Sequence, residues 1–136
     1  MADKVLLDTS IWIDYFQKSQ SPVKIVVEGL LKNRQAVFTG VIALELIRGA
    51  RSAKELAILS TLFTCIERIN ECDTTHLEAG NMGYQLARKG IIIGTVDLII
   101  GQLALENNLS LYTQDRHFSM MISTFPLKIY NETAPC

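Results

Sequence analysis

Four acidic residues stand where a carboxylate can do chemistry. Asp8 follows the apolar run Val5–Leu7, which is typical of a buried strand, and Asp115 follows a second such run. Asp97 stands at the expected start of a helix, and Glu45 lies within a strongly apolar helical stretch. Ligands of open parallel sheets bind beyond the carboxyl ends of the strands. If the two strands are neighbours, the acids are expected to converge on one crevice.

Such a cluster of acids predicts a bound cation. Carboxylates crowded in a desolvated crevice raise one another's pKa, and a cation stabilises their charged forms. Because the cluster offers oxygen donors, Mg²⁺ or Mn²⁺ is the expected ion. An ion in this setting supports hydrolysis of phosphate esters, since it lowers the pKa of an attacking water and stabilises developing charge. A hydrolytic nuclease is therefore the leading hypothesis.

Each acid also has a simpler interpretation that the sequence leaves open. Asp8 and Asp115 could cap a turn or a helix, and Asp97 could interact with a helix dipole alone. Glu45 could pair with Arg48 on the same helix face. The prediction therefore depends on the joint placement of the four acids.

The elements that must position these acids alternate between strands and helices. Strands are expected at 5–7, 36–39, 65–69 (an edge strand), 109–113 and 127–130. Helices are expected after Ser21-Pro22, over Val41–Gly49, after the capping box Ser52–Glu55, from a second capping box at Thr75–Glu78 to about Gly90, and over Val96–Asn107 with Thr95 as N-cap. This order predicts an α/β fold with a parallel sheet covered on both faces.

Length and composition predict a single domain. The chain has 136 residues, of which 49% are hydrophobic and 20% charged, with 8 Gly and 3 Pro. A chain of this size buries enough surface for one core, without disulfides or a structural metal. It has no apolar run of membrane-spanning length and no signal peptide, so a cytoplasmic location is expected.

The cysteines and histidines are given no chemistry at this stage. Cys65 and Cys72 are expected to be small buried apolar side chains, and Cys136 a thiol in a frayed tail. His76 and His117 are expected to be surface residues and not general bases.

Four segments together resemble the PIN-domain family. Leu6–Ile13 (LLDTSIWI) resembles the family's opening hhDTSxhh, and Thr39–Gly49 (TGVIALELIRG) resembles its second motif with an E-L-x-x-G core. Thr95–Ile100 (TVDLII) is similar to the third acidic motif, and Leu111–Phe118 (LYTQDRHF) to the closing T-x-D-x-x-F. Order and spacing match over nearly the whole chain. At this length the chain is most similar to VapC-like toxin ribonucleases of type II toxin–antitoxin pairs.

The resemblance implies a fold, an activity and a set of site residues. The implied fold is a three-layer α/β/α sandwich with a mostly parallel sheet of strand order 3-2-1-4-5. The implied activity is hydrolysis of RNA with Mg²⁺ or Mn²⁺, and the implied partner is a VapB-like antitoxin protein. By the same resemblance, the metal ligands are Asp8, Glu45, Asp97 and Asp115, supported by hydrogen bonds from Thr9 and Thr113. The chain departs from the family's pattern at two places. Gly94 stands where many members have Pro before the third acid, which affects the start of that helix. Gly101-Gln102 replaces the usual small Ala pair on the same helix, which affects its packing.

The charge distribution supports a nucleic-acid substrate better than the net charge of the whole chain suggests. The chain has 13 basic and 14 acidic residues, a formal net charge of −1. Without the four candidate ligands, 10 acids remain against 13 bases, which leaves a scaffold charge of +3. Arg48, Arg51 and Arg116 are the expected phosphate contacts, with a solvated rim as the alternative.

The segment after Asp8 predicts an interaction surface. Ile11, Trp12, Tyr15 and Phe16 crowd into one short helical stretch, more apolar surface than a small sheet edge can cover. Exposed apolar patches usually mark protein interfaces. A homodimer and docking of an antitoxin segment in a groove leading to Asp8 are expected. Asp14, in the same stretch, has no assigned role.

Other functions remain as alternatives. A phosphatase of the haloacid-dehalogenase type also begins with a strand and an Asp, but it needs a second Asp two residues on, where this chain has Ser10. A phosphorylation-receiver domain fits less well, because it needs its acceptor on a middle strand. A stand-alone PIN nuclease and a catalytically idle PIN-like module that binds RNA or protein also stay open.

Overall fold

A parallel five-stranded sheet forms the centre of the molecule. The computed structural model describes residues 3–17 and 20–131. All strand pairs within it are parallel, in the order β3-β2-β1-β4-β5. The strands are β1 (Val5–Leu7), β2 (Ala36–Thr39), β3 (Glu67–Ile69), β4 (Ser110–Tyr112) and β5 (Lys128–Ile129). The expected α/β fold and strand order are confirmed.

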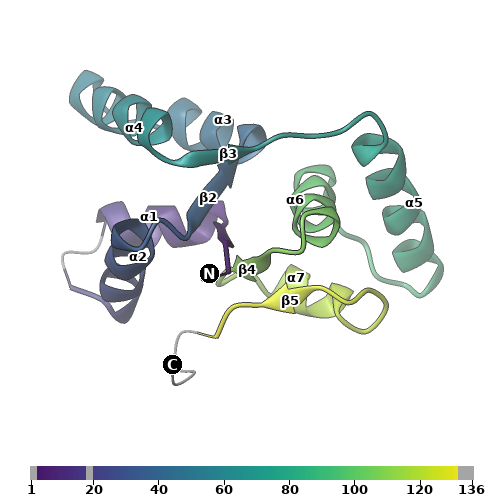
Figure 1. The fold of residues 1–136 in the computed structure, drawn as a ribbon. Helices are drawn as coiled ribbons and strands as arrows, with labels where there is room; N and C mark the ends of the chain where they lie inside the picture. Colours follow the sequence, from purple (N-terminus) through teal and green to yellow (C-terminus); the bar gives the residue numbers. More distant parts are fainter. Residues whose placement is uncertain (1–2, 18–19, 132–136) are drawn as a thin grey trace.

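Helices flank the sheet on both sides, as the three-layer prediction requires. They are α1 (Thr9–Gln17), α2 (Pro22–Lys32), α3 (Gly40–Arg48), α4 (Ala53–Cys65), α5 (Thr75–Arg88), α6 (Thr95–Glu106) and α7 (Arg116–Met121). Helices α1 and α2 lie on one side of β1 and β2, and α5 and α6 pack together on the other (Figure 1).

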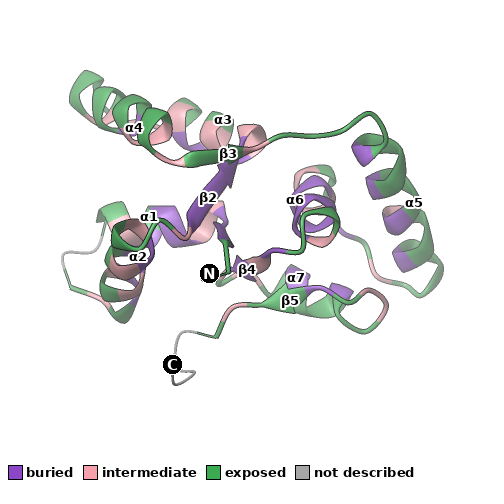
Figure 2. Cartoon of the chain, in the orientation of Figure 1, coloured by how far each residue is buried: buried purple, intermediate pink, exposed green. Residues whose placement is uncertain are grey.

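The core forms where apolar strands meet the inner helix faces. All residues of β1 and β2 are buried, which explains why neither strand alternates between apolar and polar positions. Fully buried side chains from the helices complete this core, among them Ile11, Trp12 and Leu103. Figure 2 shows the buried positions gathered on the central strands and on the inward faces of α5 and α6, whereas the edge strands β3 and β5 are largely exposed.

The chain changes direction across the sheet between β1 and β4. From β1 the chain adds β2 and then β3 on one side, and it returns to place β4 and β5 on the other. Leu7 lies level with Tyr112, and the Asp8 amide donates to the Tyr112 carbonyl at 3.0 Å. Such a switch point opens a crevice beyond the carboxyl ends of the strands. Asp8 stands at that crevice.

Several helix ends agree with the sequence. The Ser21 hydroxyl accepts from the Lys24 amide at the start of α2, and the Ser52 hydroxyl accepts from the Glu55 amide at the start of α4. Gly90, with φ of 82°, follows the end of α5, a backbone conformation that favours glycine.

Other details of the elements were predicted wrongly. Helix α5 has Thr74 as its N-cap, because Thr75 is fully buried and donates instead to Glu106 Oε2 at 2.7 Å. Helix α6 has Gly94 as its N-cap, with Thr95 as its first residue. The six-residue α7 was not predicted at all.

The expectation of buried cysteines was also wrong. Cys65 and Cys72 are both exposed free thiols. Cys65 is the last residue of α4, and Cys72 lies in the connection before α5, so neither belongs to an inward helix face. Cys136 lies outside the described residues.

None of the described helices is both long and apolar enough to cross a bilayer.

Candidate active site

Asp8 is the buried carboxylate at the switch point between β1 and β4. It is 4% exposed and follows β1 directly. Its Oδ1 accepts from the Ser10 hydroxyl at 2.5 Å, and its Oδ2 accepts from the Thr113 hydroxyl at 2.5 Å. The Ile11 amide also points to Oδ1, at 3.4 Å. These donors hold both carboxylate oxygens in a fixed orientation.

The loop after β4 carries the second acid to the same place. The Thr113 hydroxyl donates to Asp8 and accepts from the Asp115 amide at 2.9 Å. Asp115 Oδ1 in turn accepts from the His117 amide at 2.9 Å, so Asp115 is the N-cap of α7. The capping interpretation of Asp115 is thus correct, and its second oxygen remains available to the crevice.

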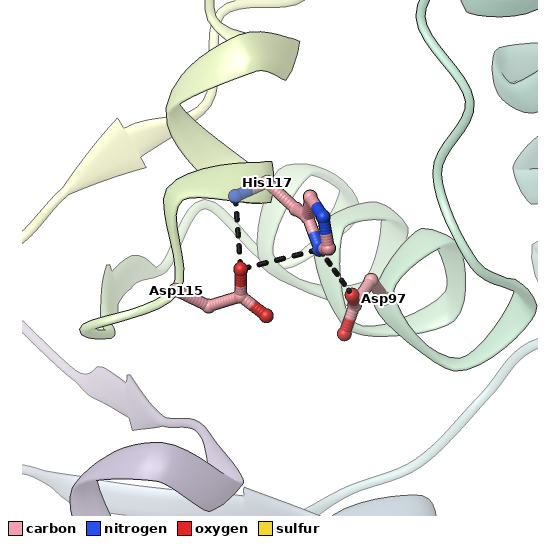
Figure 3. A group of neighbouring side chains, drawn as sticks. All are labelled: Asp97, Asp115 and His117. Carbon is pink, nitrogen blue, oxygen red and sulfur yellow. Dashed lines mark hydrogen bonds and ion pairs between the residues drawn. The ribbon is translucent and has the colours of Figure 1, made fainter.

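His117 lies beside Asp115 and Asp97 at the site, a position that the sequence did not predict for it. Its Nδ1 lies 3.2 Å from Asp115 Oδ1 and 3.6 Å from Asp97 Oδ2 (Figure 3). The three side chains each offer one donor atom, all within 4.8 Å of one another. His117 is half exposed, so it is a surface residue as expected, but one at the site. Its place in the first turn of α7 could be foreseen only by predicting that helix.

Glu45 enters the site from α3. Its Oε1 accepts from the Thr9 hydroxyl at 2.6 Å, which links the start of α1 to the middle of α3. Within residues 3–17 and 20–131, Arg48 makes no ion pair, so the alternative of a Glu45–Arg48 pair is wrong. Glu45 is therefore oriented by a hydroxyl and not by a cation of its own helix.

The acids act on one another electrostatically. Burial raises the pKa of Asp8, hydrogen bonds from Ser10 and Thr113 oppose that rise, and the charge of Asp115 adds to it. Burial also raises the pKa of Asp97, followed by the charge of Asp115; His117 lowers this pKa and Glu45 raises it. The charge of Asp115 thus acts on both Asp8 and Asp97, and the charge of Glu45 acts on Asp97, in the way expected of carboxylates that share a cation.

The three arginines predicted to contact phosphate, Arg48, Arg51 and Arg116, are all exposed. Arg68 was not among the predicted contacts, and its guanidinium lies against Gly40, the first residue of α3. A Cβ built on Gly40 would approach Arg68 Nη2 to 2.8 Å. A fourth cation therefore stands at the carboxyl end of β2.

The apolar surface beside Asp8 is smaller than predicted. Ile11 and Trp12 are fully buried in the core, whereas Phe16 and its neighbour Ile13 are about 40% exposed. Burial of Trp12 is explained by aromatic contacts with Tyr15, Phe16 and Phe63. Asp14, assigned to no role, is buried at 5% exposure.

A groove runs from this smaller apolar surface to the site. Its volume is about 500 Å³. The residues that line it come from α1, α3, α4 and the α3–α4 connection: Ile13, Phe16, Gln17, Glu45, Leu46, Gly49, Arg51, Glu55 and Leu59. Glu45 thus belongs both to the acidic cluster and to the groove.

The fold and the acidic crevice together define the class of protein. A PIN domain family model matches residues 5–121, which is most of the chain. The chain belongs to the PIN domain family.

Similar proteins were found by sequence and by structure. The chain is 29% identical to Ribonuclease VapC1 of Methanocaldococcus jannaschii over 129 residues, covering 95% of this chain and 88% of that protein. It is 26% identical to Ribonuclease VapC11 of Mycobacterium tuberculosis over 121 residues, covering 86% and 90%. The crystal structure of VapBC2 from Rickettsia felis bound to a promoter DNA fragment matches with a TM-score of 0.76 at 24% identity, covering 93% of this chain and 97% of that one.

Proposed function

We propose that this chain is a ribonuclease that hydrolyses RNA phosphodiester bonds with Mg²⁺ or Mn²⁺, and that it is the toxin of a toxin–antitoxin pair. The observation that carries the proposal is the group of Asp97, Asp115 and His117 in a PIN domain, together with the effect of Asp115 on the pKa of Asp8 and of Glu45 on the pKa of Asp97. The names of the relatives support the choice of RNA as substrate. We place the activity in the cytoplasm, where RNA and the proposed antitoxin are found.

The side chains present fit a hard divalent cation. Asp97 and Asp115 place oxygen donors beside His117, and the raised pKa values of Asp8 and Asp97 reflect burial and uncompensated negative charge. Carboxylate oxygens are the donors that Mg²⁺ and Mn²⁺ prefer, and Mn²⁺ also tolerates an imidazole. When bound, the ion would lower the pKa of an attacking water and stabilise charge on the phosphate. We propose the four acids as its ligands, with His117 as a neighbour of two of them.

The other polar side chains of the site orient these ligands. Thr113 and Ser10 donate to opposite oxygens of Asp8, which favours its charged form against the cost of burial. Thr9 orients Glu45 by one hydrogen bond at 2.6 Å. We propose Thr9 and Thr113 as supporting residues, because each hydroxyl fixes a carboxylate that would otherwise rotate.

RNA binding is proposed for the exposed arginines around the crevice. Arg48, Arg51 and Arg116 present charged heads that make no ion pair within the described part of the chain. Free guanidinium groups suit phosphate contacts, which position RNA without reading its sequence.

A VapB-like antitoxin segment is proposed to occupy the groove that ends at Glu45. The groove combines apolar side chains from α1, α3 and α4 with the charges of Glu45, Glu55 and Arg51. An amphipathic segment with a basic residue would match this surface. The expected homodimer loses two of the four apolar side chains on which it was based, and it remains a prediction that sedimentation can test.

Metal binding separates an active nuclease from an idle PIN-like module. Calorimetric titration of Mn²⁺ into the metal-free chain is expected to give saturable binding, and Asp115→Asn is expected to weaken it strongly. Asp73→Asn, a change at an exposed acid in the connection before α5, is the matched control. An absence of Mn²⁺ binding by the unaltered chain would contradict the proposed activity. A neighbouring gene for a small DNA-binding protein would support the toxin assignment over a stand-alone nuclease.

A further inference from the structure

We propose that Asp14 is a positioning residue that holds the loop carrying Thr113 and Asp115 in place through Gln114. Its consequence for catalysis rests on the proposed nuclease function, whereas its consequence for the loop does not. A buried carboxylate is costly unless its oxygens are hydrogen-bonded, so its presence on α1 requires an explanation.

The contacts of Asp14 supply that explanation. Its Oδ1 accepts from the Ser21 hydroxyl at 2.9 Å, and Ser21 is the N-cap of α2. Its Oδ2 accepts from the Gln114 side-chain amide at 3.0 Å. Gln114 stands between Thr113 and Asp115, 100 residues further along the chain. Asp14 therefore joins two helices to the loop of the site.

Asp14 acts together with Ser10, one helical turn before it. The Gln114 backbone amide donates to the Ser10 hydroxyl at 3.0 Å, and Ser10 itself donates to Asp8. Residues at i and i+4 lie on the same helix face. One face of α1 therefore accepts two hydrogen bonds from Gln114, through Ser10 from its backbone amide and through Asp14 from its side-chain amide. With the Ser10 hydrogen bond alone, the loop could rotate about that contact. The second hydrogen bond, to Asp14, fixes the orientation of the loop.

Gln114 lies in the sequence directly between two residues of the site. Thr113, one residue before it, donates to Asp8, and Asp115, one residue after it, lies beside Asp97 and His117. Removal of the Asp14–Gln114 hydrogen bond should therefore leave Asp8 in place and free the Asp115 side of the loop. Asp14 needs no contact with metal or RNA for this effect.

The test begins with hydrogen exchange in the metal-free chain. Asp14→Ala and Gln114→Ala are each expected to speed exchange of the amides of residues 114–117 about five- to tenfold, the effect of losing one hydrogen bond, with β1 unchanged. The double variant is expected to add little to either single one, because both remove the same hydrogen bond. Unchanged exchange at 114–117 in both single variants would overturn the proposal, whatever the activity of the chain.

Two further variants separate positioning from general stability. Ser21→Ala removes the hydrogen bond from the Ser21 hydroxyl to Asp14 and the α2 cap, so it should lower the melting temperature and leave exchange at 114–117 unchanged. Asp14→Asn should restore slow exchange, since Gln114 can turn its amide and accept from the new Asn donor. If Asp14→Asn behaved like Asp14→Ala, the negative charge and not the hydrogen bond would be responsible, and the proposal would be wrong.

Metal affinity and kinetics then connect the loop to catalysis. Asp14→Ala is expected to bind Mn²⁺ about five- to tenfold more weakly by calorimetry, and to lower kcat for RNA with KM nearly unchanged. Faster exchange in 114–117 with unchanged Mn²⁺ affinity would contradict the positioning role while leaving the nuclease proposal intact. If the unaltered chain bound no Mn²⁺, the nuclease proposal would fail, and the exchange result would still decide on the loop.

Discussion

Asp97 carries its charge under conditions that favour the neutral form. Burial and the charge of Asp115 raise its pKa above the usual 3.8, with Glu45 adding to the rise and His117 opposing it. A carboxyl whose pKa is higher in the folded chain contributes stability below the unfolded pKa. That contribution is lost as the pH rises through the folded value. The metal-free site is thus a source of instability at neutral pH.

This sign predicts how an Asp97 variant responds to pH. In chelator at pH 7, Asp97→Asn is expected to melt at the same or a higher temperature than the unaltered chain, because it removes repulsion. Toward pH 4 this advantage should shrink, because the raised pKa makes Asp97 take up its proton earlier than an ordinary carboxyl as the pH falls. Thermal unfolding at the two pH values measures the difference. A large drop in melting temperature at pH 7 would instead mark Asp97 as a structural residue.

The arginines around the site should act through phosphate charge. Arg48→Ala, Arg51→Ala and Arg116→Ala are each expected to weaken RNA binding. Each should also flatten the slope of log K against log salt by about one for every phosphate that the variant no longer binds. Binding to RNA labelled with a fluorophore, repeated across salt concentrations, gives these slopes. Slopes that stay equal to the slope of the unaltered chain in all three variants would return these side chains to an ordinary solvated rim.

Sequence reasoning located the acids better than their neighbours. Asp8 and Asp115 could be foreseen because each ends an apolar strand, and parallel strands bring such ends to one edge. The role of Asp14 could not, since its partner Gln114 is 100 residues away. Exposure of Cys65 and Cys72 depends on how α4 and its neighbours pack, and local sequence does not encode that packing.

At the scale of elements, the closeness of α6 and α7 depends on a glycine. A Cβ added to Gly101 would approach Met121 Cε to 2.6 Å, and Met121 is fully buried. The absence of a side chain at Gly101 thus leaves the space that the end of the Met121 side chain occupies. Helix α7, which carries Asp115 at its cap, lies close to α6 as a result.

Substitution of Gly101 should therefore cost stability. Gly101→Ala is expected to cost about 1–3 kcal/mol in overpacking, because the terminal methyl of the fully buried Met121 has to move, against roughly 1 kcal/mol that Ala gains in a helix. The expected net destabilisation is therefore up to about 2 kcal/mol. Gly80→Ala in α5 is the matched control, because nothing lies within 4 Å of its added Cβ. The control should stabilise by about 0.5–1 kcal/mol. Urea unfolding measures both, and stabilisation by Gly101→Ala would contradict the packing account.

Elements with an apolar run, helical spacing or a cap were predictable, and the shortest helix was not. The strands follow from apolar runs, and helices α2 to α6 follow from helical spacing and caps such as Ser21 and Ser52. Helix α7 has six residues, too few turns for a periodic signal. The N-cap of α5 fell on Thr74 because Thr75 is drawn inward by Glu106, a tertiary contact.

At the scale of the whole molecule, the groove and the acidic crevice share Glu45. An antitoxin segment that fills the groove could place an Arg or Lys among the carboxylates, where it would neutralise the charge that binds the metal. Metal and antitoxin are then expected to compete.

Competition of this kind has a reciprocal signature. Mn²⁺ should weaken antitoxin affinity, and the antitoxin should weaken Mn²⁺ affinity by the same factor. Calorimetric titration of the proposed VapB-like antitoxin into the chain, with and without saturating Mn²⁺, measures the change in antitoxin affinity. Titration of Mn²⁺ with and without the antitoxin measures the reciprocal change. Equal antitoxin affinities would show that inhibition covers the RNA path without contacting the metal ligands.

The central claim is that four carboxylates form a metal site for RNA hydrolysis, and cleavage by the purified chain tests it most directly. The chain is stripped with chelator, supplied again with Mn²⁺, and compared with Asp8→Asn under the same conditions. The account predicts no cleavage in chelator and recovery with Mn²⁺. It also predicts a loss of several kcal/mol of transition-state stabilisation, at least about a hundredfold in rate, for Asp8→Asn. Full cleavage by Asp8→Asn in chelator would contradict it.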